Sequence, residues 1–331
     1  MPAYVPSTGF SGVTNIGEHL VISQIENNIK SFLDWGFLHI GGFINVQRPQ
    51  INIYGVPPHK LKATDDPNYS LGRVWQTMRK DWVWESNIVF ADRYDPSITT
   101  TPILITGIYI SNTFYSLATT GQYSYKVDYI NSRIIFNSPV PTSLDISMEY
   151  SYRWVQVYTY DNAKWWQQLQ YKTDQNVKHF DQLATGDFSL FSTNRVQLPS
   201  VIIESIARGI SKPYELGSKS LILRQDLLLH VVAETMADRN MIIDILRLQQ
   251  DKFIQLYDTN LVIKNGVGPY NIDGTLNINR VQYDSLITNP TYQWEKIRLI
   301  NIYASDVESF SPFLAESKIK LTAELILGIH N

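Results

Sequence analysis

Histidines and acidic residues are the side chains of this sequence best suited to bind metals or transfer protons. The six histidines are His19, His39, His59, His179, His230 and His330. No two of them have the H-x-x-x-H or H-E-x-x-H spacing that brings two imidazoles onto one metal ion. His39 and His230 fall in predicted strands, where a packed histidine with one hydrogen bond is far commoner than a ligand. Turn chemistry explains Asp65-Asp66 and Asp273-Gly274 without calcium. We therefore expect no metal site.

Paired carboxylates are the other candidates for catalysis. Asp81, Glu85, Asp128 and Glu149 lie in aromatic-rich stretches, but their spacing does not bring two acids across a cleft, as glycoside hydrolysis requires. The G-x-S-x-G, G-x-x-x-x-G-K and G-x-G-x-x-G motifs do not occur. The chain contains no cysteine, which excludes a thiol nucleophile, thiolate zinc sites and disulfides. We expect a protein that is not an enzyme and uses no cofactor.

Composition indicates a folded protein of more than one structural unit. The 331 residues are 44% hydrophobic and 18% charged, with a net charge of −3, which is typical of globular chains. Binding nucleic acid through broad electrostatics needs a basic face, and no basic run is visible. The N-terminal sequence lacks the features of a secretory signal, and no stretch of about 18 apolar residues occurs. We expect a soluble protein made in the cytosol.

The segment Ser218–Asn260 organises the rest of the chain. Its first half, Leu221–Glu234, is apolar enough to predict a strand buried on both faces. Thr235-x-x-Asp238 then predicts a helix N-cap, with the helix beginning near Ala237. A helical stripe follows that packs on the sheet. Its members are Ile242, Ile245, Leu246, Gln249 and Phe253.

Further elements flank this segment. Asn15-x-x-Glu18 resembles a capping box, and an apolar face from Val21 to Leu33 predicts a helix that Gly36 ends. Phe37–Val46 is predicted as a strand interrupted at Gly41-Gly42. Ser200–Ile210 is a short helix or strand. Trp294–Ala304 and Ser317–Ile329 are predicted as closing strands, with Lys318, Lys320 and Glu324 alternating against apolar residues in the second.

A β-rich unit interrupts this arrangement. Short β-branched and tyrosine-rich runs with regular turns begin at Thr99 and predict a β-sandwich or barrel. Its predicted strands are Ile103–Ile110, Tyr123–Tyr129, Arg133–Phe136, which follows a turn at Asn131-Ser132, and a long last strand, Leu144–Tyr158. The fold class is therefore α+β. A mixed β-sheet domain with flanking helices, formed by residues 1–86 and 159–331, carries an inserted β-sandwich-like domain at 87–158.

Trp75, Trp82 and Trp84 lie beside Arg73, Arg79 and Lys80. Such a mixture can stack on bases or sugars, but large aromatic side chains more often fill a core or an interface. We favour packing for the three tryptophans.

Several segments together resemble the neck and tail-terminator proteins of tailed bacteriophages. These segments are LPSVIIE at Leu198–Glu204, YELGSKS at Tyr214–Ser220, LLLHVVAE at Leu227–Glu234, DRNMIIDILRLQ at Asp238–Gln249 and KFIQLYD at Lys252–Asp258. YKVDYINSRIIF at Tyr125–Phe136 is similar to a Y-x-V-D-Y-x-N-G-x-I-x-F pattern of phage virion proteins, with Ser132 in place of the usual glycine.

This resemblance implies a structural virion protein at the head–tail interface of a tailed phage, made in the host cytoplasm. The resemblance implies a fold with a mixed sheet and helices on one side of it. It also implies assembly as a ring, commonly a hexamer. The ring caps the tail tube, contacts tube or sheath protein, and joins the head-side connector or adaptor. DNA passes through the lumen without sequence-specific binding, and no membrane is involved. A sheath terminator or a head-side connector is a neighbouring role.

A carbohydrate- or receptor-binding appendage of the tail or baseplate is the alternative function, since 20 Tyr and 8 Trp suit sugar binding as well as assembly. For the ring we expect subunit contacts at eight residues, with ordinary solvated surface as the competing interpretation of the polar ones. They are Arg224, Asp226, Arg239, Arg247, Lys252, Trp75, Trp82 and Trp84.

Overall fold

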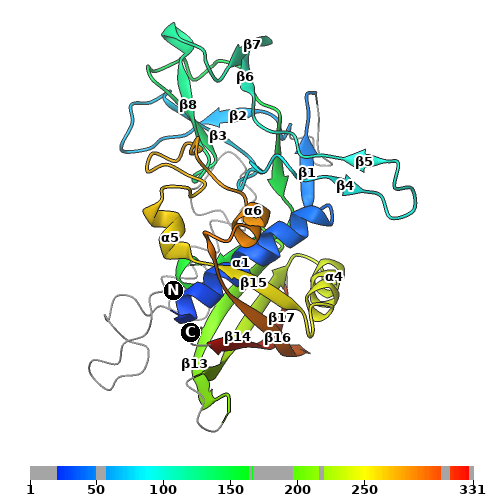
Figure 1. The fold of residues 1–331 in the computed structure, drawn as a ribbon. Coiled ribbons are helices and arrows are strands. Elements are labelled where there is room, and N and C mark those ends of the chain that lie inside the picture. Colours follow the sequence, from blue (N-terminus) through cyan, green and yellow to red (C-terminus); the bar gives the residue numbers. More distant parts are fainter. Residues whose placement is uncertain are drawn as a thin grey trace.

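The computed structural model describes residues 21–49, 57–163, 166, 197–215, 220–306 and 314–327, without the side chains of 207, 208, 306 and 327. It is a mixed α+β fold (Figure 1). The helices are α1 (Val21–His39), α4 (Met236–Arg247), α5 (Thr259–Lys264) and α6 (Tyr283–Thr288), with 3₁₀ turns η2 (Gly121–Tyr123) and η3 (Tyr160–Asn162). The predicted α+β class is confirmed.

One curled six-stranded sheet organises the lower half of the molecule (Figure 1). In spatial order its strands are β12 (Gln156–Thr159), β13 (Ser200–Pro213), β14 (Leu221–Ala233), β17 (Ala315–Leu327), β16 (Gln293–Asp306) and β15 (Phe253–Tyr257). The β12–β13 pair is parallel and every other pair is antiparallel, so the sheet is mixed. β14 and β17 pair along their whole length, which places the predicted central strand in the middle of the sheet.

Helices α1 and α4 pack on the same face of this sheet and enclose its main core. The core joins Ile25 and Ile29 of α1 to Ile242 and Leu246 of α4 over alternate residues of the strands, such as Leu229. The period of two along a strand sends the intervening residues to the opposite face. The prediction of helices packed on the sheet is confirmed.

The predicted corner before α4 is also confirmed, whereas the predicted end of the helix is wrong. The Thr235 hydroxyl accepts a hydrogen bond from the Asp238 amide at 3.1 Å, as an N-cap does. The helix ends at Arg247 and does not continue to Phe253, which begins β15. The chain reverses through Asp251, whose φ is +63°. Pairing with β16 therefore overrides the helical periodicity of the sequence.

The end of α1 differs from prediction in a similar way. The helix runs through Gly36 to His39, and two bonds then close a Schellman motif: Gly42 N–H to Phe37 O at 2.8 Å and Gly41 N–H to Leu38 O at 3.1 Å. Gly41 has a φ of +85°, which glycine adopts without strain. The predicted strand Phe37–Val46 is thereby reduced to β1 (Phe43–Val46). Asn15 and Glu18 lie outside the described residues.

Polar side chains of α1 seal one edge of the sheet. Asn28 is fully buried, donates from Nδ2 to the Tyr257 carbonyl and accepts from the Tyr257 amide, both at 2.9 Å. Gln24 accepts from the Thr259 amide at 3.0 Å. The side-chain amide of Asn28 thus replaces a neighbouring strand for β15, because buried backbone groups require partners.

The upper half of the molecule is a cluster of small antiparallel sheets (Figure 1). They are β2 (Leu61–Ala63), β3 (Val74–Thr77), β9 (Arg133–Phe136) and β8 (Tyr125–Asp128) in one sheet; β10 (Ile146–Ser147), β6 (Gly107–Ile110) and β7 (Thr113–Ser116) in a second; β1 with β11 (Tyr150–Arg153); and β4 (Phe90–Ala91) with β5 (Thr99–Thr100). Because β2 and β3 pair within this half, the β-rich unit begins before the predicted boundary at residue 87.

The predicted long strand Leu144–Tyr158 is three short strands in three different sheets. β10 pairs with β6, β11 with β1, and β12 with β13. The chain therefore passes from the β-rich half into the main sheet, so its alternating pattern reflects burial against several partners. The turn at Ser132 is confirmed: Ser132 has a φ of +53° and its Oγ accepts from the Asp81 amide at 2.9 Å.

Replacing Asn28 by Leu tests the edge seal. The change leaves the buried N–H and C=O of Tyr257 without their side-chain partner, and each unsatisfied group costs about 1–3 kcal/mol. We expect the free energy of unfolding to fall by about 2–4 kcal/mol, measured by urea denaturation. Asn27→Leu is the matched control, because the Asn27 amide bonds only to Ser23 within α1. Equal losses in both variants would contradict the edge seal.

Candidate assembly surface

A buried cluster of charges lies where α1 meets the β-rich half. The Arg153 guanidinium contacts Asp34 at 2.7 Å, Glu85 at 2.6 Å and Asp81 at 3.8 Å. It also donates to the Trp82 carbonyl at 2.9 Å. Arg153 and Glu85 are both buried. One cation therefore faces three carboxylates in a region of low dielectric, which ties three segments of the chain together.

This balance of charges raises the pKa of Glu85 to about 7. Burial is the main cause, the Arg153 charge opposes it, and the Asp34 carboxylate adds to it. A strongly shifted pKa often marks a functional site. Here the Arg153 guanidinium already bonds to Asp34, Glu85 and the Trp82 carbonyl. We therefore interpret the cluster as a structural link between segments of the chain.

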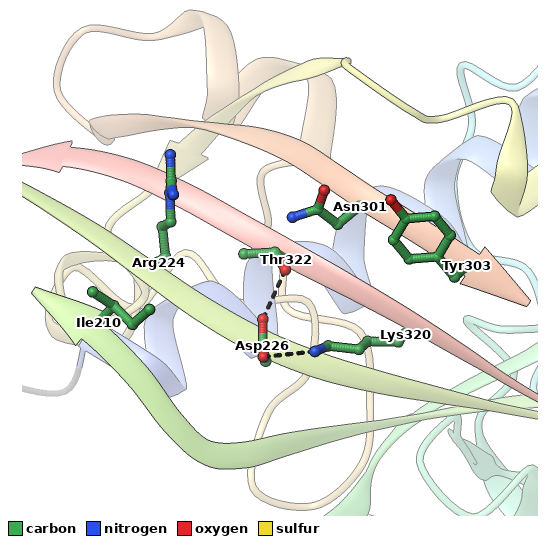
Figure 2. Close-up of a pocket in the computed structure, with 7 residues that line it drawn as sticks. All are labelled: Ile210, Arg224, Asp226, Asn301, Tyr303, Lys320 and Thr322. Carbon is green, nitrogen blue, oxygen red and sulfur yellow. Dashed lines mark hydrogen bonds and ion pairs between the residues drawn. The ribbon is translucent and has the colours of Figure 1, made fainter.

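The opposite face of the main sheet has a different character. At one end of this outer face Ala163 and Trp166 pack over Ile202 and Val232. In the rows around Asp226 no described helix packs on it, while α1 and α4 cover the other face. A shallow hollow of about 240 Å³ opens on it. Figure 2 shows its lining: Ile210 from β13, Arg224 and Asp226 from β14, Asn301 and Tyr303 from β16, and Lys320 and Thr322 from β17.

The charges of the outer face are paired across neighbouring strands. Asp226 accepts from Lys320 at 3.0 Å and from the Thr322 hydroxyl at 2.7 Å (Figure 2). Arg224 contacts Glu324 at 2.6 Å in the next row of the sheet. Antiparallel register places these residues directly opposite or diagonal to one another. The face is therefore polar without carrying unpaired charge in these rows.

Exposed apolar side chains surround these ion pairs. Tyr303 is 66% exposed, Phe253 67% and Ile210 43%. Ile326 is also exposed. The Arg298 guanidinium lies over the Phe253 ring at 5.8 Å. Aromatic and aliphatic groups among polar ones are the composition of a protein contact surface.

Of the eight predicted contact residues, two lie on the outer face: Arg224 and Asp226. Arg239 donates to the Glu316 carbonyl at 3.1 Å, and Arg247 is the last residue of α4. Lys252 lies over the Phe32 ring of α1 at 5.1 Å. These three belong to the helix side and do not form one surface with the first two.

The three tryptophans are core residues. Trp75, Trp82 and Trp84 are at most 8% exposed and belong to the core of the β-rich half. Trp75 donates to the Gly72 carbonyl at 2.9 Å, and Trp82 donates to the Thr77 hydroxyl at 3.1 Å. Packing is confirmed, and their burial leaves at most 8% of each residue exposed for a subunit contact.

Sequence reasoning missed Tyr303 and Asn301 of the hollow. A register shift between Ile300 and Tyr303, with Asn301 at a φ of +56°, re-aims this part of β16, and single-sequence periodicity does not reveal such a bulge. Lys320 carried a signal, because it alternates with apolar residues in the predicted last strand.

His230 is the packed histidine that its strand predicted, and its ring nitrogen Nε2 lies 2.6 Å from Glu204. His39, which the sequence placed in a strand, is the last residue of helix α1. It contacts the Trp35 ring, with ring centroids 3.8 Å apart. Among the described residues, no group of three or more His, Asp or Glu side chains is placed to hold a metal ion.

No protein-family model matches this chain, and no curated protein matches it. Within the described ranges, no helix has the length and apolar character needed to cross a membrane.

Replacing Glu85 by Gln tests the charge cluster. Since the folded protein raises the pKa of Glu85 above its unfolded value, Glu85 stabilises the fold fully below about pH 4.5, and this contribution is lost as the pH rises towards about 7. We expect the stability difference between wild type and Glu85→Gln to change by at most about 1.4 kcal/mol per pH unit in that window.

Urea denaturation at several pH values measures this difference. Glu234→Gln, at an exposed acid, is the control and should not show the same change between pH 5 and 7. A difference between wild type and Glu85→Gln that stays constant with pH would contradict the raised pKa of Glu85.

Proposed function

We propose that the protein is a structural subunit at the head–tail interface of a tailed phage, of the tail-terminator or neck class. The single observation that carries this proposal is the main sheet with helices on one face and, on the other, exposed apolar side chains among the paired charges around Asp226. Three of the segments that resemble this family form β14, α4 and β15, which follow one another along the chain: the two strands belong to that sheet and α4 packs on it.

A ring subunit needs contact faces that combine apolar anchors with polar groups. The outer face offers Tyr303 and Ile210 as anchors and paired charges between them. Paired charges reduce the cost of removing the face from water, because no lone ion is buried. The face therefore suits contact with another protein surface.

The proposed assembly is a ring, commonly a hexamer in this class, that caps the tail tube and joins the head-side connector. Its partners are copies of itself, tube or sheath protein, and the connector. DNA would pass through the lumen, for which a chain with a net charge of −3 needs no basic reading surface.

A carbohydrate- or receptor-binding role is favoured by one observation in the β-rich half. Phe114 of β7 is exposed and packs on Tyr109, with ring centroids 5.1 Å apart, and the Arg48 guanidinium lies 4.1 Å above the Tyr109 ring. Aromatic rings of this kind can stack on sugars. Loss of polysaccharide binding in Phe114→Ala, measured by calorimetry, would support this alternative.

Replacing Tyr303 by Ser tests the contact face. An exposed tyrosine that becomes a buried anchor contributes about 2 kcal/mol or more, so we expect the dissociation constant of the oligomer to rise about thirtyfold or more. Analytical ultracentrifugation and electron micrographs of the ring measure the effect. Ile278→Ser, at a site that is 91% exposed in a loop, is the control.

Unchanged assembly in Tyr303→Ser would remove the outer face from the proposal. A protein that stays monomeric alone and in the presence of tail tubes would overturn the ring itself.

A further inference from the structure

The lower half of β13 is an open sheet edge. Its upper half pairs with β12 over Ser200–Ile203, and a bulge follows between Ser205 and Gly209. Beyond the bulge, Gly209–Pro213 pairs with β14 alone among the described strands, and these five residues are exposed. An open edge of this kind is a template for another strand.

The ladder identifies the backbone groups that face outward. The Tyr214 amide donates to the Ser220 carbonyl at 2.9 Å. Antiparallel ladders alternate between bonded and non-bonded pairs, so Lys212 and Ile210 direct their N–H and C=O groups toward β14. Gly209 and Ser211 therefore direct theirs toward the open edge. Pro213, which has no N–H, limits this edge to Gly209–Lys212.

The hairpin of β4 and β5 is a second open edge in the same chain. It forms a sheet of its own and projects sideways from the molecule, well separated from the lower end of β13 (Figure 1). The Asp92 amide donates to the Ile98 carbonyl at 2.9 Å, so by the same alternation Thr99 directs its N–H and C=O outward. Two-stranded hairpins are marginally stable in isolation, and a further strand would stabilise this one.

The tip of this hairpin is organised before any partner binds. Asp92 accepts from the Tyr94 amide at 2.7 Å, and Asp95 accepts from the Ser97 amide at 3.1 Å and its hydroxyl at 2.6 Å. At the base, Ile88 is fully buried. Tyr94 is 92% exposed and Ile98 is exposed as well. A held hairpin with exposed apolar side chains loses little entropy on docking.

We infer that β5 of one copy pairs with the Gly209–Lys212 edge of β13 in a neighbouring copy. This inference rests on the ring function proposed above and specifies how two subunits of the ring meet. The two edges lie on different surfaces of one chain, so the contact is head-to-tail and can close a ring by rotation. β5 fits because Ile and Thr favour extended structure and because Ile98–Thr100 is exposed. The next residue, Thr101, is also exposed, but its carbonyl accepts from Asn45 Nδ2 at 3.0 Å, so the open edge ends at Thr100.

The register follows from the outward groups. Antiparallel pairing places Thr99 opposite Ser211, where both backbones offer a donor and an acceptor. The alternation of side chains then places Ile98 and Thr100 on the face that carries Ile210, with Ile98 diagonal to Ile210. The added strand would extend the main sheet at the rim of the hollow in Figure 2.

Cysteine cross-linking tests this contact, because the natural chain has no cysteine. Residues opposite each other on paired strands lie within the Cα separation of a disulfide. Protein carrying only Thr99→Cys is mixed with protein carrying only Ser211→Cys under mild oxidation, and covalent dimers are measured on non-reducing gels. Both sites are exposed, and thermal melts verify that each variant folds.

We expect dimers about tenfold or more above those from a control mixture of Ser211→Cys and Ile278→Cys, since contact raises the effective thiol concentration. Chains carrying both Thr99→Cys and Ser211→Cys should form a ladder that ends at the ring number. Equal cross-linking in the control, or dimers from Ser211→Cys alone, would overturn the inference.

Native mass spectrometry of the same samples separates this inference from the ring proposal. Rings without the expected cross-link overturn the strand contact and leave the proposed function in place. Cross-linked open chains retain the contact and overturn the closed ring, and monomers without cross-links overturn both.

Discussion

The pairing of backbone hydrogen-bond groups along the margins of the six-stranded sheet is the constraint on which the rest of the structure depends. At the β15 margin, Asn28 of α1 supplies the donor and acceptor of a missing strand. At the other margin, β12 covers β13 only as far as Ile203. A buried margin must be satisfied, whereas an exposed one can use water. The same rule therefore fixes α1 against the sheet and leaves one part of β13 open to a partner.

A second constraint holds the two halves of the molecule together. Arg153 of β11 reaches Asp34 of α1 and Glu85 of the β-rich half. Buried ion pairs often add little net stability, because desolvation offsets much of the attraction. Their geometry is nevertheless specific, since removing either partner leaves an unpaired charge. The cluster thus fixes how α1 approaches the β-rich half, and α1 in turn carries Asn28 to the sheet edge.

Much of the main sheet could be predicted from the sequence, because β14, the Thr235 cap and β17 depend on local patterns. The end of α4 could not, since the turn at Asp251 is set by pairing with a strand distant in sequence. The place of β2 and β3 could not be predicted for the same reason, since they pair with one another and with β9, which is distant in sequence.

The site was predictable to a smaller extent. Arg224 and Asp226 stand out as polar residues in an apolar strand, which is a local signal. Their neighbours across the sheet, Lys320 and Thr322, come from a segment almost a hundred residues later, and register is not encoded locally. For the tryptophans the residue type alone does not distinguish an internal core from an interface that buries the same rings.

The distribution of charge on the outer face bears on how it could act in an assembly. Asp226 with Lys320 and Arg224 with Glu324 neutralise each other within one chain, so a docking partner meets no lone ion whose desolvation would oppose binding. Affinity would then come from apolar side chains at the rim, such as Ile210 and Tyr303, whose burial is favourable but unspecific. Direction and register need a second source, and the open backbone groups of β13 supply it, because hydrogen bonds along a strand edge accept a partner only in a few discrete alignments.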